Sequence, residues 1–235
     1  MNTSNISHAQ SLDQQDELAH FRQRFAPINP DLIYLDGNSL GRLPLAAQQR
    51  LQDIIQHEWG QRLIRGWSEG WIDAPARIGG KIAHLIGTEE DEVLLADSTS
   101  VNLYKLALAS LLAQPERRKI VTDDLNFPSD LYILQSVCKL VGEDCQLEVV
   151  RSQDGIHGPV EKLAQAVDSN TALLSLSHTV FKSGYTYNMA EVTRIAHQGG
   201  AMALWDLSHS VGALPVDLQQ AEADLAVGCT YKYLN

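Results

Sequence analysis

Cysteine and basic residues are scarce in this sequence of 235 residues. The three cysteines, Cys138, Cys145 and Cys229, are an odd number without metal-ligand spacing, which argues against a disulfide framework and fits a reducing compartment. Lysine and arginine number 18 against 29 aspartates and glutamates, so the formal net charge is −11. A nucleic-acid partner is therefore not expected, because proteins that bind a phosphate backbone need a basic surface to displace its counterions.

Long apolar runs are also missing. The longest mainly apolar stretch, residues 106–113, is far shorter than the roughly 20 residues that a helix needs to cross a bilayer. The first thirty residues are mostly polar and contain no apolar signal-peptide core. We therefore expect a cytoplasmic protein without a membrane partner. A composition of 44% hydrophobic and 20% charged residues is typical of a soluble globular chain.

What the sequence does contain is an alternation of short β-prone runs and helical patterns. Residues 1–45 form a mostly polar segment that ends near the turn-forming run Asp36–Gly41. Strands that alternate with helices from residue 46 onward indicate an α/β domain with a mostly parallel sheet. The predicted strands are residues 92–95, 119–122, 147–150, 172–176, 201–205 and 224–227, and the predicted helices are residues 45–64, 74–87, 101–113, 129–142, 159–167 and 189–198.

Ligands of such sheets bind beyond the carboxyl ends of the strands, so the residues that follow each β run are the candidates for a site. After the run at 92–95 come the hydroxyls of Thr99 and Ser100, at the start of a predicted helix. Exposed amide hydrogens at a helix start, together with hydroxyls, suit a phosphate. Ordinary helix capping is the alternative, because serine and threonine are favoured caps.

The segment Phe127–Asp130 follows the run at 119–122. Pro128 fixes the backbone, and Ser129 and Asp130 can cap the next helix, which leaves the ring of Phe127 near the cleft. A ring in that place is suited to stacking on a planar cofactor. The alternative is that Phe127 belongs to the core.

A carboxylate and an amine follow the last two β runs. Asp206 ends a buried run, where a carboxylate is costly unless a cation such as a pyridinium nitrogen pairs with it, and His209 is placed to support it. The alternative is a helix cap by Asp206 or Ser208 beside a structural histidine. Lys232 follows an apolar run, where burial lowers the pKa of an amine as a Schiff-base lysine requires. The alternative is an ammonium group that reaches solvent.

The order of these residues is more informative than any one of them. Each lies just beyond a β run, and Asp206 precedes Lys232. A phosphate site, a stacking ring, a carboxylate and an amine are the parts that a pyridoxal-phosphate site needs. The sequence therefore predicts pyridoxal 5'-phosphate as the cofactor, carried by Lys232.

Several strings in the sequence resemble those of kynureninases, which belong to the aspartate-aminotransferase structural superfamily (fold type I). They include Tyr34–Gly41 and residues 97–103, 126–132, 205–212 and 228–235. The resemblance covers nearly everything from about residue 15 onward. The strings YLDGNSLG and YKYLN are quite specific, because related desulfurases and aminotransferases surround the lysine differently.

The resemblance implies a role for each candidate. Lys232 is similar to the lysine that carries the cofactor, and Tyr231 to a tyrosine bonded to the phosphate and implicated in proton transfer. Asp206 resembles the carboxylate on the pyridine nitrogen, with His209 beside it, and Ser177 matches a position near the cofactor. The other cofactor-binding candidates are Thr99 and Ser100, at the phosphate, and Phe127, Pro128, Ser129 and Asp130, over the ring face.

The reaction implied by the resemblance is hydrolysis of the Cβ–Cγ bond of L-kynurenine, and in some cases of 3-hydroxykynurenine. The products are anthranilate or 3-hydroxyanthranilate and L-alanine, in tryptophan catabolism, and the expected assembly is a homodimer. The family continues beyond Asn235, so we expect residues 46–235 to be an incomplete cofactor-binding large domain, without the small C-terminal domain and inactive by itself. Two alternatives stay open: another fold type I enzyme such as a cysteine desulfurase, and a non-catalytic fragment.

Overall fold

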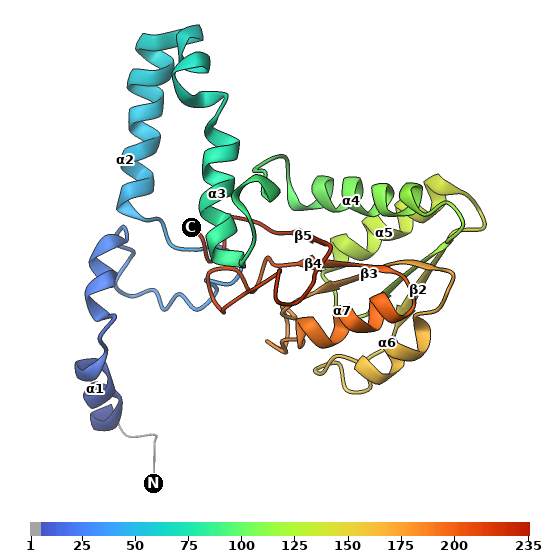
Figure 1. Ribbon diagram of the computed structural model, residues 1–235. Coiled ribbons are helices and arrows are strands. Elements are labelled where there is room, and N and C mark those ends of the chain that lie inside the picture. Colours follow the sequence, from blue (N-terminus) through green and yellow to red (C-terminus); the bar gives the residue numbers. More distant parts are fainter. Residues whose placement is uncertain (1–5) are drawn as a thin grey trace.

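A parallel five-stranded sheet with the strand order β2-β1-β3-β4-β5 organises the protein (Figure 1). The computed structural model describes residues 6–235. Every pair of neighbouring strands is parallel, with Leu174 opposite Ala203 and Asp206 opposite Val227 in the register. The strands are β1 (Lys119–Asp123), β2 (Gln146–Val150), β3 (Thr171–Ser177), β4 (Met202–Asp206) and β5 (Leu225–Val227).

Helices cover both faces of this sheet, as parallel strands require, because each crossover places a helix on one face. In Figure 1, α4 (Thr99–Ala113) and α5 (Pro128–Val141) lie on one face, and α6 (Val160–Ala166) and α7 (Met189–Gln198) lie on the other. The expected α/β fold with a mostly parallel sheet is confirmed.

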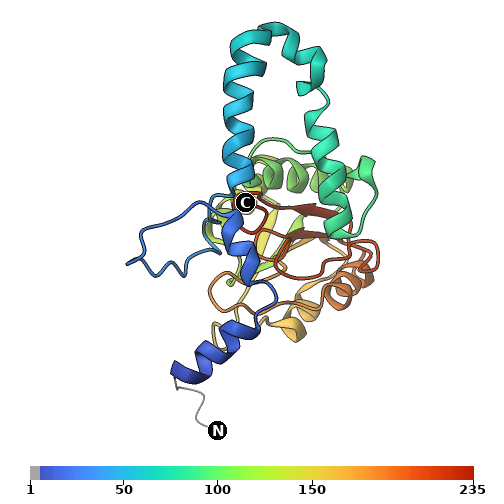
Figure 2. The same ribbon diagram turned by 90° about the vertical axis from the view of Figure 1, so that its left-hand side faces the viewer.

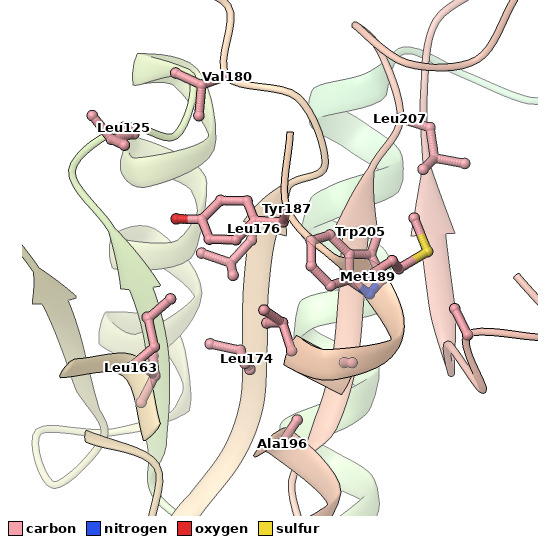
Figure 3. Packing of buried hydrophobic residues seen from close by; sticks show 14 of the residues in the cluster. Leu125, Leu163, Leu174, Leu176, Val180, Tyr187, Met189, Ala196, Trp205 and Leu207 are labelled. Carbon is pink, nitrogen blue, oxygen red and sulfur yellow. The ribbon is translucent and has the colours of Figure 1, made fainter. Parts of the chain in front are cut away.

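The core follows from the alternation of side chains along each strand. Leu173 and Leu204 are buried in one cluster with residues of α4 and α5, whereas their neighbours Leu174 and Trp205 are buried in the other cluster with residues of α6 and α7 (Figure 3). Burying a side chain of this size stabilises the fold by about 1.5–3 kcal/mol. The Trp205 indole donates a hydrogen bond of 3.1 Å to Thr193 Oγ1, so its polar atom is also satisfied inside the core.

An arm of helical segments stands away from the sheet (Figures 1 and 2). It rises along α2 (Leu45–Asp53) and returns along α3 (Ala74–Ile86). The helical pattern predicted over 45–64 is confirmed as far as Arg62, but the type of turn changes after α2. Residues 54–62 form wider turns of the π type, none of them is buried, and the helix is interrupted at Leu63, where φ is 53° and ψ is −132°. The pattern was helical, but no core packs against this stretch to hold regular α-helical turns.

The predicted strand at 92–95 is wrong. Residues Glu90–Glu92 form a 3-10 turn, held by a reciprocal cap between Glu89 and Glu92, and Val93 is extended without a neighbouring strand. Val93–Ala96 and the β5 residue Ala226 line the same cavity, but in the described part of the chain β5 pairs only with β4. Among residues 6–235, no helix is long and apolar enough to cross a bilayer.

The N-terminal region returns to the end of the sheet. It begins with α1 (Ile6–Gln15) and a 3-10 turn over Ala19–Arg24. The turn predicted at Asp36–Gly41 is present, because the amides of Ser39 and Leu40 donate to the Asp36 carbonyl at 3.0 and 3.2 Å. This turn packs against the segment that contains Lys232, as described below.

Candidate active site

A cavity of about 770 Å³ opens at the carboxyl ends of β4 and β5, where the first turns of α4 and α5 converge on it. Side chains from four separate stretches of the chain therefore meet in one place. The predicted residues that line the cavity are Thr99, Ser100, Phe127, Ser129, Asp130, Asp206, Tyr231 and Lys232.

The start of α4 forms one corner of the cavity. Ser98 is the residue that caps the helix, because its hydroxyl accepts a 3.4 Å bond from the Val101 amide. Thr99 lies at the first helical position and donates a 3.1 Å bond to the Gly228 carbonyl, beyond the end of β5. The capping alternative thus applies to Ser98 instead of Thr99 or Ser100, and the first amides of a 15-residue helix point toward the cavity end, where an anion is stabilised.

The loop before α4 is tied to the helix that follows it. Asp97 has a left-handed backbone with φ 44° and forms an ion pair with Lys105. The side-chain amide of Asn102 donates a 2.7 Å hydrogen bond to the backbone carbonyl of Ala96. The side chains of Asn102 and Lys105, in the first turns of α4, therefore fix this loop, in which Asp97 has a strained backbone. Both Asp97 and Lys105 line the cavity.

The carboxylate of Asp206 is buried at the end of β4 and is 5% exposed. One of its oxygens accepts bonds from the Ser208 amide at 2.9 Å and from the Ser208 hydroxyl at 2.6 Å. Residues 207–210 form turns and no helix, so the helix-cap alternative for Asp206 does not apply. Asp130, in the first turn of α5, is 3% exposed, and burial and then the negative charge of Asp206 raise the pKa of its carboxyl to about 7.

Lys232 is 8% exposed and faces the same cavity. Its amine lies 3.0 Å from His209 Nε2 and 5.4 Å from the centre of the Phe127 ring. Burial, and then the charge of Lys232, lower the pKa of His209 to about 4. The imidazole is therefore neutral near pH 7 and can accept a proton of the lysine amine in a hydrogen bond. His209 does not line the cavity itself and supports Lys232 from behind.

Phe127 and Pro128 shape the wall between these groups. The Phe127 residue is 37% exposed, so it is not part of the core. The centre of its ring lies 5.0 Å from the centre of the Phe181 ring, in an edge-on arrangement. Pro128 is the first residue of α5, where a fixed φ suits the helix start. Its side chain is not part of the cavity lining.

Ser177 also lies outside the cavity lining. Its amide and hydroxyl both donate to the side-chain oxygen of Asn126, at 2.7 and 2.6 Å. Asn126 in turn donates to Thr122 Oγ1 at 3.0 Å and to the Ser175 carbonyl at 3.3 Å. The hydroxyl of Ser177 is therefore engaged in joining the end of β3 to the loop that follows β1, outside the cavity lining.

Two residues at the site were missed by the sequence reasoning. Cys229 lines the cavity beside Tyr231, and burial and then the charge of this cysteine raise the pKa of the Tyr231 hydroxyl. The Gly41 amide donates a 2.9 Å bond to the Tyr231 carbonyl, and a Cβ at position 41 would overlap the Lys232 carbonyl oxygen. The signal for Cys229 was its place two residues before Tyr231, whereas the contact of Gly41 had no local signal.

The cavity combines a buried amine, a buried carboxyl pair, a helix start with hydroxyls and an exposed aromatic ring. An amine forms a covalent bond with a carbonyl group, a carboxylate holds the proton of a ring nitrogen, and a helix start with hydroxyls binds a phosphate. The donor set therefore fits a planar, phosphorylated carbonyl cofactor.

Comparison with known proteins gives a family and a set of relatives. The aminotransferase class-V family matches residues 33–234. The chain is 49% identical over 230 residues to the kynureninase of Pseudomonas fluorescens, an alignment that covers 96% of this chain and 53% of that protein. It is 47% identical over 232 residues to the kynureninase of Burkholderia mallei (strain SAVP1), covering 97% of this chain and 54% of that one. The chain spans about half the length of the curated relatives it matches.

Solved structures share the fold at lower identity. The cysteine desulfurase of Thermococcus onnurineus NA1, in its apo form, matches with a TM-score of 0.75 and 21% identity, covering 92% of this chain and 53% of that one. A C-DES variant, described as carrying glycine covalently linked to its PLP cofactor, matches with a TM-score of 0.76 and 18% identity, covering 90% and 56%.

Proposed function

Because the chain belongs to the aminotransferase class-V family, we propose that the protein is a kynureninase that uses pyridoxal 5'-phosphate, bound covalently to Lys232. The reaction is the hydrolysis of L-kynurenine to anthranilate and L-alanine, with 3-hydroxykynurenine as a possible second substrate. One observation carries this proposal: the buried amine of Lys232 shares a cavity with the buried carboxylate of Asp206 and the ring of Phe127.

The cofactor, when bound, supplies an electron sink for the carbanion formed at the substrate Cα. Asp206 holds a proton on the ring nitrogen, and this charge strengthens the sink. The amine of Lys232 would hold the cofactor and, once the substrate amine has taken its place, would be free to act as the general base that moves the Cα proton. A positioned acid or base of this kind typically contributes about 10²–10⁴-fold to the rate.

The remaining side chains bind and orient. Thr99, Ser100 and the amides at the start of α4 hold the phosphate, with Tyr231 as a further phosphate contact and a proton donor. Phe127 and Ser129 cover the ring face. His209 accepts a hydrogen bond from Lys232 and so fixes the amine while it waits for substrate.

The relatives favour this reaction over that of a cysteine desulfurase. The kynureninases are 47–49% identical to the chain, whereas the desulfurase structure that shares the fold is 21% identical. Cys138 and Cys145 are buried in the core, and burial raises the pKa of the Cys138 thiol to about 12. Such a thiol is a poor nucleophile.

The assembly, organisation and location follow the same proposal. The protein is a homodimer in the cytoplasm, and its chain divides into an N-terminal segment, 1–45, and a cofactor-binding domain, 46–235. The arm supports the dimer, because its large apolar side chains Trp59, Ile64 and Trp67 are 64%, 76% and 54% exposed. Exposed apolar groups of this number on one element are typical of an interface.

The test is to add pyridoxal phosphate to the purified protein and to Lys232→Ala. We expect a yellow wild-type protein and a cofactor that borohydride fixes on Lys232 in the peptide map. Anthranilate fluorescence on addition of L-kynurenine is expected from a full-length kynureninase chain and not from residues 1–235 by themselves. In that full-length chain, Lys232→Ala should fold and lose turnover. Fixation on another lysine would overturn the site, and cofactor binding without anthranilate from the full-length chain would leave the non-catalytic alternative.

A further inference from the structure

One aromatic ring lies against both groups that flank the amine of Lys232. The amine lies 5.4 Å from the centre of the Phe127 ring and 3.0 Å from His209 Nε2. The ring centre of Phe181 lies 5.0 Å from that of Phe127, edge-on, and 6.2 Å from that of His209, with the ring planes at 31°. Phe181 is not among the residues that line the cavity, so it acts on the amine only through these two neighbours.

A hairpin over residues 178–187 holds Phe181 in place. The Val180 amide donates a 2.8 Å hydrogen bond to the Tyr185 carbonyl, across the turn that begins at Phe181. Val180 and Tyr187, one on each side of the hairpin, are both 2% exposed and belong to the core. Because the chain is anchored on both sides of the turn, the ring of Phe181 is a fixed neighbour for the side chains that pack against it.

Phe127 and His209 need such a neighbour. Phe127 is 37% exposed, so part of its surface has nothing packed over it. The imidazole of His209 is bonded to the amine of Lys232, which ends a flexible side chain, so this bond alone does not fix the plane of the imidazole. Aromatic rings at these separations favour edge-on and tilted arrangements, which are the ones that Phe181 makes with the two rings.

We propose that Phe181 is a positioning residue, whose ring holds Phe127 and His209 in the places from which they flank the amine of Lys232. The inference deepens the proposed function, on which it rests, because it names what directs the amine that holds the cofactor. With the imidazole held in place, its Nε2 accepts a proton of the amine in a hydrogen bond, and the Phe127 ring bounds the space in which the amine moves. Without the Phe181 ring, the imidazole can turn and the amine loses its fixed direction.

Two variants separate this role from simple packing. Phe181→Ala removes the ring that lies against the site. Tyr185→Ala is the matched control, because it removes an aromatic ring of the same hairpin whose ring neighbours are His157 and Tyr187, at 5.6 and 5.0 Å. Both changes should lower the free energy of unfolding, but only the first should alter the site. If Phe181→Ala does not fold, Phe181→Leu, which keeps an apolar side chain without a ring, takes its place.

The first measurement needs no cofactor. A neutral histidine carries its proton on one ring nitrogen when the other accepts a hydrogen bond. His209 Nε2 accepts from Lys232, so NMR of the cofactor-free protein with nitrogen-labelled histidine should show the His209 proton on Nδ1 near pH 7. The His209 signal is identified by its absence from His209→Gln.

In Phe181→Ala this signal should move toward a mixture of the two forms of the neutral imidazole, and in Tyr185→Ala it should stay. A wild-type His209 that is itself such a mixture overturns the proposal. So does an unchanged signal in Phe181→Ala, or an equal change in the two variants.

The second measurement uses the loaded protein. The visible circular dichroism of a bound cofactor depends on how the protein orients it, and this band should lose intensity in Phe181→Ala. Cofactor affinity should also fall by about threefold to tenfold in this variant, because the Phe127 ring is no longer held. Tyr185→Ala should keep both the band and the affinity, and equal losses in the two variants overturn the proposal.

This role and the proposed function can fail separately. A His209 signal that responds to Phe181→Ala as expected, with no cofactor fixed on Lys232, leaves the role of Phe181 at the amine standing and rejects the proposed function. Cofactor fixed on Lys232, with the same His209 signal in Phe181→Ala and in the wild type, rejects the role of Phe181 alone.

Discussion

At the scale of single residues, a third buried carboxyl, that of Asp123, makes the stability of the core depend on pH. Asp123, at the end of β1, is 1% exposed and accepts a hydrogen bond from the hydroxyl of Tyr187. Burial raises its pKa to about 6, although the bond from Tyr187 acts in the opposite direction. The folded protein therefore keeps a proton on Asp123 at pH values where the unfolded chain has already lost it.

We expect the free energy of unfolding to fall as the pH rises from about 4 through 6, because in this window the folded state binds more protons than the unfolded state. Asp123→Asn should remove this part of the decline, roughly 1–3 kcal/mol, since one pKa unit corresponds to about 1.4 kcal/mol. Urea titrations at several pH values provide the measurement. Asp124→Asn should reduce the decline only slightly, because the charge of Asp124 is the smallest of the influences on the pKa of Asp123.

The carboxylate of Asp206 is expected to matter for chemistry far more than for folding. Asp206→Asn keeps the shape and can still accept a bond from Ser208, but it no longer holds a proton on the ring nitrogen. We expect kcat to fall by about 10²-fold or more, while the urea midpoint stays close to that of the wild type. Unchanged steady-state kinetics would reduce Asp206 to a structural residue.

At the scale of elements, the site depends on a contact between two loops that are far apart in the sequence. The turn at residues 36–41 packs against residues 231–235, and the Gly41 amide donates to the Tyr231 carbonyl at 2.9 Å. No side chain fits between the two loops, because a Cβ on Gly41 would overlap the Lys232 carbonyl. The backbone of Lys232 is thus set in part by a glycine in the N-terminal segment.

Gly41→Ala should push the Lys232 loop away from the cavity and weaken cofactor binding. Overpacking of this kind typically costs about 1–3 kcal/mol, which corresponds to about tenfold or more in affinity. Gly37→Ala is a control in the same turn, since a Cβ at Gly37 would have nothing within 4 Å. Cofactor titration followed by absorbance measures both variants, and equal affinities would show that the contact between the loops does not position Lys232.

The elements themselves were largely predictable from the sequence. The runs at 119–122, 147–150, 172–176, 201–205 and 224–227 became the five strands. Three of these strands, β1, β3 and β4, are buried along nearly their whole length, and such strands carry near-continuous apolar runs that a local pattern reveals. The run at 92–95 carries the same pattern but has no neighbour to pair with. A strand needs a partner, and the presence of a partner is not a local property of the sequence.

Part of the site was also predictable from the sequence. Asp206 and Lys232 follow strands, and the geometry of a parallel sheet brings such residues together. Ser177 also ends a strand, yet its hydroxyl is bound to Asn126 outside the cavity lining. The contact of Gly41 with the Lys232 loop depends on tertiary packing, and so does the position of Asp130 near Asp206. Residue spacing alone reveals neither.

At the scale of the whole molecule, the arm has apolar side chains with nothing packed over them. Trp59, Ile64 and Trp67 lie on it, and residues 54–62 contain no buried side chain. We expect the protein to self-associate through this arm. Ile64→Lys should raise the dissociation constant by about tenfold or more, as measured by sedimentation equilibrium. Leu12→Lys, an exposed apolar position on α1, should have no effect; equal dissociation constants for Ile64→Lys and the wild type would show that the arm is not the interface.

The hydrogen bond between Thr99 and the Gly228 carbonyl joins residues that are synthesised at different times. Its two partners are 129 positions apart, so a ribosome that adds about 5–20 residues per second makes the second on the order of ten seconds after the first. During that interval α4 and the early strands can form. The start of α4, where the phosphate is proposed to bind, still lacks its partner Gly228, and Lys232 has not yet been synthesised. The nascent chain therefore cannot capture its cofactor by partial folding, and supply of the cofactor is a step that follows translation of the last strand.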